Sequence, residues 1–91
     1  MPDATPDLTT ITVHVLFFSM LREETDTHEL DVSLDAPATG DDLIDRLEED
    51  FPAVSDHRSS LRLAVNQAYS PTDAPLRDGD EVALITPVSG G

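Results

Sequence analysis

The residues best suited to chemistry lie at the end of the printed sequence, which closes with Gly90-Gly91. Glycine has no Cβ, so a diglycine segment can thread a narrow channel in almost any backbone conformation. A terminal carboxylate is a poor electrophile and must first be activated, typically as an acyl-adenylate made from ATP. A cysteine nucleophile and a thiolate metal site are both excluded, because the chain has no cysteine. We therefore interpret Gly91 as the reactive terminus and Gly90 as the residue that lets the tail thread.

The composition limits the partners of the chain. Its 91 residues suffice for one small domain, and its net charge is −14. Nucleic acid is not an expected partner, because phosphate binding draws on clustered Arg and Lys, whereas all five basic residues here are Arg. No apolar run approaches the roughly 18–20 residues that span a bilayer. We expect a cytoplasmic protein that does not bind a membrane.

The acidic charge has two interpretations. High charge with few aromatic residues favours disorder. A folded protein with a strongly acidic, solvated surface, as in halophiles, is the alternative. The regular alternation of apolar residues along the chain favours the second interpretation.

Two segments near the N-terminus alternate with the period of a β-strand. Residues 10–18 are predicted to form the first strand, and residues 27–34 the second, with a polar connection over residues 19–26. The residues expected to face inward are Ile11, Val13, Val15 and Phe17 in the first strand and His28, Leu30, Val32 and Leu34 in the second.

A helix and further strands follow. Thr39-Gly40-Asp41-Asp42 resembles a capping box at a helix start, and Phe51-Pro52 ends the helix. The apolar stripe of this helix consists of Leu43, Ile44, Leu47 and Phe51. Later strands are expected at 61–65, around Tyr69 and at 81–86, with a turn at Asp78-Gly79. The order predicts an α+β fold in which one main helix packs on a mixed sheet of four to five strands.

Several stretches resemble a known family. Val15-Leu16-Phe17-Phe18 followed by Arg22-Glu23, then Ala64-Val65-Asn66-Gln67, and finally residues 75–83 and 87–91 are similar to the small subunit of molybdopterin synthase. Relatives of that family include the archaeal ubiquitin-like small modifier proteins. Thr86 departs from the pattern, since the family often has proline there. The resemblance implies a ubiquitin-like β-grasp over residues 10–87, with first and last strands parallel and adjacent. We expect residues 1–9 to be a flexible arm and residues 88–91 a mobile tail.

The resemblance also implies a function. An E1-like activating enzyme would adenylate Gly91 with ATP, and sulfur would then replace one oxygen to give a thiocarboxylate. The larger synthase subunit would accept the tail and pass the sulfur to the pterin precursor. The chain itself would be non-catalytic alone and would bind no cofactor.

A partner-binding surface is expected beside the tail. Phe18 has no obvious core role, and Tyr69 and Ile85 are expected on the same outward sheet face, where the family binds its partner. Val88 in the tail and Arg22, which could meet an acidic group of the partner, complete the predicted interface.

Two other functions remain open. In a protein modifier, the same activated Gly91 is attacked by a lysine of a target protein. A passive β-grasp binding module would need no free C-terminus. A metal site is not expected, because His14, His28 and His57 lie on separate predicted elements without ligand spacing.

Overall fold

The computed structural model describes residues 10–86, apart from the side chain of Ser19. The arm (1–9) and the tail (88–91) lie outside this range, so their mobility stays a prediction. The elements within it are β1 (Thr10–Phe17), α1 (Ser19–Thr25), β2 (Glu29–Asp35), β3 (Ala38–Thr39), α2 (Gly40–Asp50), α3 (Pro52–His57), a 3-10 turn (Arg58–Ser60), β4 (Arg62–Val65), β5 (Ala68–Ser70), β6 (Pro75–Leu76) and β7 (Glu81–Ile85).

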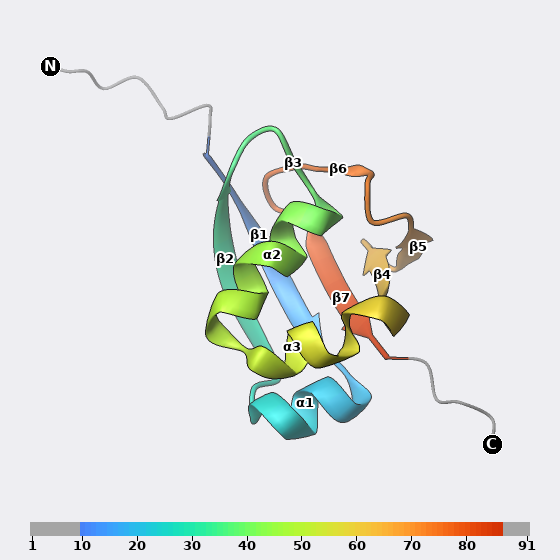
Figure 1. Ribbon diagram of the computed structural model, residues 1–91. Coiled ribbons are helices and arrows are strands. Elements are labelled where there is room, and N and C mark those ends of the chain that lie inside the picture. Colours follow the sequence, from blue (N-terminus) through green and yellow to red (C-terminus); the bar gives the residue numbers. More distant parts are fainter. Residues whose placement is uncertain (1–9, 87–91) are drawn as a thin grey trace, which may run out of the picture.

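Five strands form one mixed sheet in the order β2-β1-β7-β4-β5 (Figure 1). β1 and β7 are parallel, with Val15 opposite Val82 and Phe17 opposite Leu84. The other neighbouring strands are antiparallel. This confirms the predicted β-grasp arrangement with adjacent, parallel first and last strands. Because the two strands run in the same direction, both end at the same edge of the sheet.

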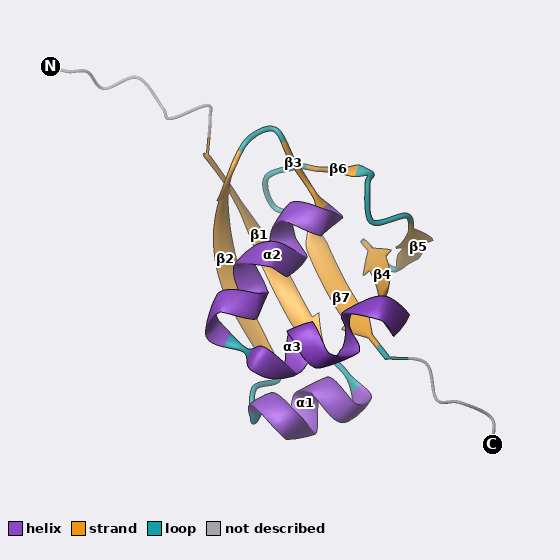
Figure 2. Cartoon of the chain, in the orientation of Figure 1, coloured by secondary structure: helices purple, strands orange, loops and turns teal. Residues whose placement is uncertain are grey.

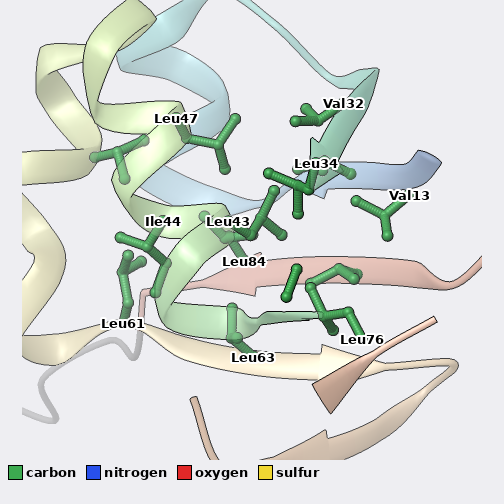
Figure 3. Packing of buried hydrophobic residues seen from close by; sticks show 14 of the residues in the cluster. Val13, Val32, Leu34, Leu43, Ile44, Leu47, Leu61, Leu63, Leu76 and Leu84 are labelled. Atoms are coloured by element: carbon green, nitrogen blue, oxygen red, sulfur yellow. The ribbon is translucent and has the colours of Figure 1, made fainter. Parts of the chain in front are cut away.

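The core lies between one face of this sheet and α2 (Figure 3). The predicted inward residues of β1 are 0–8% exposed, and Leu43, Ile44 and Leu47 of α2 are 0–1% exposed. Burial of each such side chain contributes roughly 1.5–3 kcal/mol. α2 and α3 lie on this face, and α1 lies at the edge where β1 ends (Figure 2). The opposite sheet face is formed by the alternate strand residues, which stay exposed or half-buried.

The capping box predicted at Thr39 is confirmed. The Asp42 N–H donates to Thr39 Oγ1 at 3.3 Å, and the Thr39 N–H donates to Asp42 Oδ2 at 2.9 Å. Both bonds satisfy amide groups that the first helical turn leaves unpaired. α2 therefore begins at Gly40, directly before its apolar stripe.

The polar connection predicted over residues 19–26 is wrong, because Ser19–Thr25 form α1. One apolar residue anchors this helix, since Leu21 is fully buried. Thr25 Oγ1 donates to the Leu21 carbonyl at 2.7 Å, and Asp26 adopts a left-handed conformation that ends the helix. A single buried anchor gives no helical period in the sequence, so the pattern did not reveal the helix.

His28 was predicted to face inward and is instead exposed. β2 begins one residue later, at Glu29. The His28 carbonyl still accepts a hydrogen bond from the Phe17 N–H at 2.9 Å, but its side chain lies beyond the core cluster that would cover it. Val32 and Leu34 are buried as predicted, and Leu30 is half-buried.

Phe51-Pro52 ends α2 as predicted, but a second short helix, α3, begins at Pro52. Proline suits a first helical position, where its missing N–H would have no intrahelical partner. Val54 anchors α3 in the core with no exposed surface. The Phe51 ring packs edge-on against Phe17, with ring centroids 5.3 Å apart.

Candidate functional site

The predicted tail residues Val88, Gly90 and Gly91 lie outside the described residues, but the structure places the root from which they start. β7 is paired on both sides, with β1 in parallel and with β4 antiparallel. Thr86, which follows β7, is only 4% exposed. The root of the tail therefore has a fixed position at the edge where β1 also ends.

The sheet face opposite the core carries a row of apolar residues near this root. Leu16 lies opposite Ala83, Ala83 opposite Ala64, and Ala64 opposite Tyr69. Leu16, Ala64 and Ala83 alternate with core residues along their strands and so point outward, and Tyr69 shares their face because it lies directly opposite Ala64. Tyr69 is 76% exposed.

Phe18 and Ile85 extend the row toward the root. They follow Phe17 and Leu84, which lie opposite one another in the parallel pair. The Phe18 backbone is still extended, and its N–H donates to the Leu84 carbonyl at 3.3 Å. Phe18 is 40% exposed. The structure thus brings three of the predicted interface residues to one face, and we call the whole set the apolar strip: Leu16, Phe18, Ala64, Tyr69, Ala83 and Ile85.

Arg22, the fourth described residue of the predicted interface, lies in the last turn of α1. It is exposed, on the helix that begins directly after Phe18. Within residues 10–86 its side chain forms no ion pair, although the chain has 19 acidic residues. Its guanidinium is therefore available to an acidic group outside this chain.

The model of the ThiS family matches residues 15–91, which include the strip and the diglycine end. The molybdopterin synthase sulfur carrier subunit of Mycobacterium tuberculosis is 39% identical over 82 residues, covering 89% of this chain and 99% of that protein. The chain belongs to the ThiS family.

Solved structures support the fold of this ThiS-family protein. SAMP1 of Haloferax volcanii, a small archaeal modifier protein, superimposes with a TM-score of 0.75 at 26% identity. The match covers 88% of this chain and 99% of that one. A designed protein based on ubiquitin superimposes with a TM-score of 0.62 at 19% identity, covering 91% and 95% of the two chains. The fold is therefore ubiquitin-like.

The sequence interpretation missed two exposed side chains beside the strip. Met20, in the first turn of α1, is 50% exposed and lies close to Phe18 in the chain. Arg62 lies opposite Ile85 and lines a hollow of about 540 Å³ with Leu63, Tyr69, Ser70, Pro71 and Ile85. A sequence pattern could have revealed Arg62, because it alternates with the apolar Leu61 and Leu63, which are buried, and so lies on the outward face.

The other end of this sheet face is acidic. His14 lies between Asp31 of β2 and Glu81 of β7 in the pairing register. Its Nδ1 lies 2.7 Å from Asp31 Oδ1, and its Nε2 lies 2.6 Å from Glu29 Oε1. Only the imidazolium can donate from both nitrogens. These hydrogen bonds, the one to Asp31 first and the one to Glu29 second, raise the pKa of His14.

This geometry predicts a pH-dependent contribution to stability. Because the folded-state pKa of His14 is raised above its ordinary value of 6.5, its contribution is fully present below that pH and is lost as pH rises through the folded-state pKa. We expect the difference in unfolding free energy between wild type and His14→Gln to be largest below pH 6.5 and to shrink above the folded-state pKa. Denaturant unfolding at low ionic strength measures it, because salt screens exposed pairs. A difference that is constant across pH would contradict the prediction.

The histidines do not come together. His14 lies on β1, His28 precedes β2, and His57 lies on α3, where its Nε2 is 3.0 Å from Glu24 Oε1. In the part of the chain that the structure describes, no group of three or more potential ligands is placed to hold a metal ion. Nor is any of its helices long and apolar enough to cross a bilayer.

Proposed function

We propose that this chain is the sulfur carrier subunit of a molybdopterin synthase and that Gly91 carries the sulfur. The main support is the 39% identity to the M. tuberculosis sulfur carrier subunit over nearly its full length. The family match extends to residue 91, so it includes the diglycine end.

The reaction at Gly91 has two steps. The terminal carboxylate attacks the α-phosphorus of ATP, releasing pyrophosphate and leaving an acyl-adenylate. Hydrosulfide then attacks the acyl carbon, the bond to AMP breaks and AMP leaves, and loss of the S–H proton gives the thiocarboxylate. As an anion, the thiocarboxylate is a soft nucleophile, by the same logic that makes thiolates the reactive form of cysteine. An E1-like activating enzyme would catalyse the first step.

The catalytic groups belong to the partners. The chain has no cysteine, and its one imidazole on the outward sheet face, His14, lies at the end remote from the root of the tail. Residues 87–91 span at most about 18 Å when fully extended. An active site that uses Gly91 must therefore lie within that distance of Thr86, so its protein must contact the sheet edge at the root.

The apolar strip is the surface that such a partner would contact. Phe18, Tyr69 and Ile85 would be the anchors, because exposed apolar side chains grouped on one face mark an interface. Arg22 would pair with a carboxylate at the rim, and Val88 would contact the partner at the start of the tail. The activating enzyme and the large synthase subunit each need the tail in their active sites, so they would bind in turn.

The intact mass of the protein purified from its native cells tests this function. We expect a fraction of the molecules to be heavier than the printed sequence by the difference between one sulfur and one oxygen atom. The added mass should map to Gly91 after proteolysis. The proposal would be contradicted if, in cells that make molybdopterin, every molecule carried an ordinary carboxylate at Gly91.

The similarity to SAMP1 favours a second candidate, a protein modifier. In that case the activated Gly91 would be attacked by a lysine of a target protein. The same experiment detects it, as larger species in which Gly91 is joined to a lysine. The chain has no lysine of its own, so it cannot form lysine-linked chains of itself.

A further inference from the structure

The arginines of this chain divide into two classes. On the helical side, Arg46 and Arg58 are surrounded by carboxylates. Arg46 pairs with Asp50 at 3.0 Å and lies 3.9 Å from Glu49. Arg58 contacts three acidic residues of α2: Asp41, Asp45 and Glu48.

Arg62 belongs to the other class. Among the described residues its side chain has no ion pair and no hydrogen bond, although the chain has 19 acidic residues against five basic ones. It lies opposite Ile85, the last residue of β7, and therefore beside the root of the tail. Arg22 and Arg77 also have no ion pair in the described range, but of these three arginines Arg62 is the one that lines the hollow beside the root, where a carboxylate of another molecule can reach it.

The hollow beside Arg62 indicates which kind of partner side chain would bind next to that carboxylate. Tyr69, Pro71 and Ile85 give it mostly apolar walls, and it lies at the end of the apolar strip. β5, which carries Tyr69, is one of the two edge strands of the five-stranded sheet, so a partner can approach from this side. The site fits a protein segment with one apolar side chain next to an acidic residue.

We propose that Arg62 is a specificity-determining residue, which binds a carboxylate of the protein that receives the tail while an apolar side chain of the same segment fills the hollow between Tyr69 and Ile85. The proposal rests on the proposed function, because that function requires a partner at the root of the tail. Arginine suits this role because its guanidinium forms two parallel hydrogen bonds to a carboxylate.

The surface charge explains why one such contact is selective. With a net charge of −14, the chain repels acidic surfaces in general. A partner carboxylate is tolerated only where a free cation meets it. A nucleic acid or an anionic lipid surface would meet the same repulsion over the rest of the molecule.

The test measures binding to the large subunit of molybdopterin synthase from the same organism. Arg62→Glu should weaken binding by about tenfold or more, because the reversed charge faces a carboxylate. Arg77→Glu is the matched control. Arg77 is exposed and has no side-chain ion pair in the described range, but it precedes β7 and so lies at the far end of that strand. The same change there should weaken binding by about threefold or less.

A second arm identifies the partner group. Replacing the matching Asp or Glu of the large subunit by Arg should weaken binding of the wild type and restore binding of Arg62→Glu. Arg62→Lys should retain part of the affinity. Circular dichroism and unfolding midpoints equal to wild type exclude misfolding of the variants.

The outcomes separate the two proposals. If Arg62→Glu and Arg77→Glu lose the same amount of binding affinity, the effect comes from the change in net charge, and the proposed role of Arg62 is overturned. Unchanged binding of Arg62→Glu would overturn it as well, while the proposed function stands if Gly91 still carries sulfur. Loss of self-association in Arg62→Glu without loss of partner binding would assign the hollow to a second copy of this chain and overturn the proposal.

Discussion

Deleting Gly91 should abolish thiocarboxylate formation and conjugation together, without a measurable change in stability. The shortened chain holds its carboxylate about 3.3–3.6 Å nearer to the domain. Productive geometry tolerates an error of less than about 1 Å before the rate falls by about a hundredfold. The truncated chain still ends in a carboxylate, so the loss would come from position and not from chemistry.

The measurement follows pyrophosphate release and the intact mass of the protein with an activating enzyme and ATP. Extension of the chain beyond Gly91 should have the same effect as the deletion, because it buries the reactive carboxyl in a peptide bond. Removal of residues 1–7 is the control, and it should leave the rate unchanged. If the form that ends at Gly90 is fully active, the sulfur carrier and the protein modifier are both contradicted, and the passive binding module is the remaining candidate function.

Placing a charge on the apolar strip should weaken partner binding while the fold stays intact. Tyr69→Asp is the cleanest variant, because 76% of the Tyr69 side chain is exposed and the core does not depend on it. An anchor of this kind contributes about 1–2 kcal/mol or more to an interface, which corresponds to about tenfold in affinity. Ile85→Asp and Phe18→Asp should act in the same direction.

Ser55→Asp provides the matched control, because Ser55 is exposed on α3, on the helical side of the sheet, and the change adds the same charge. Titration calorimetry with the large synthase subunit measures the affinities, and unfolding midpoints show whether each variant is folded. If Tyr69→Asp binds as well as Ser55→Asp, the strip is ordinary surface. Unfolding of Ile85→Asp alone would mean that Ile85 belongs to the core.

The strands and the main helix follow from local patterns. The alternation of β1 and the stripe of Leu43, Ile44 and Leu47 each reflect burial of one face, and that burial is the main source of stability. The capping box at Thr39 acts over three residues, so its hydrogen bonds can be read from the sequence alone. The order of the elements was predicted from these patterns. The family resemblance then implied that the first and last strands are adjacent and parallel.

Short elements with one anchor could not be read in this way. α1 depends on the burial of Leu21, and α3 on that of Val54. Each anchor is recognisable only once the sheet and α2 provide the core that receives it. The exposure of His28 likewise depends on where the packed core ends, and tertiary structure sets that point.

The sequence by itself led to the prediction of Gly91 as the reactive residue, because a diglycine is a covalent feature that needs no fold to be recognised. It also named Phe18, Tyr69 and Ile85, which lie far apart in the chain. Only the tertiary structure decided that Arg62 joins them. Pairing of β4 with both β5 and β7 places residues 62, 69 and 85 around one hollow. Such contacts between distant strands depend on register, and no local pattern of residues specifies which side chains a register brings together.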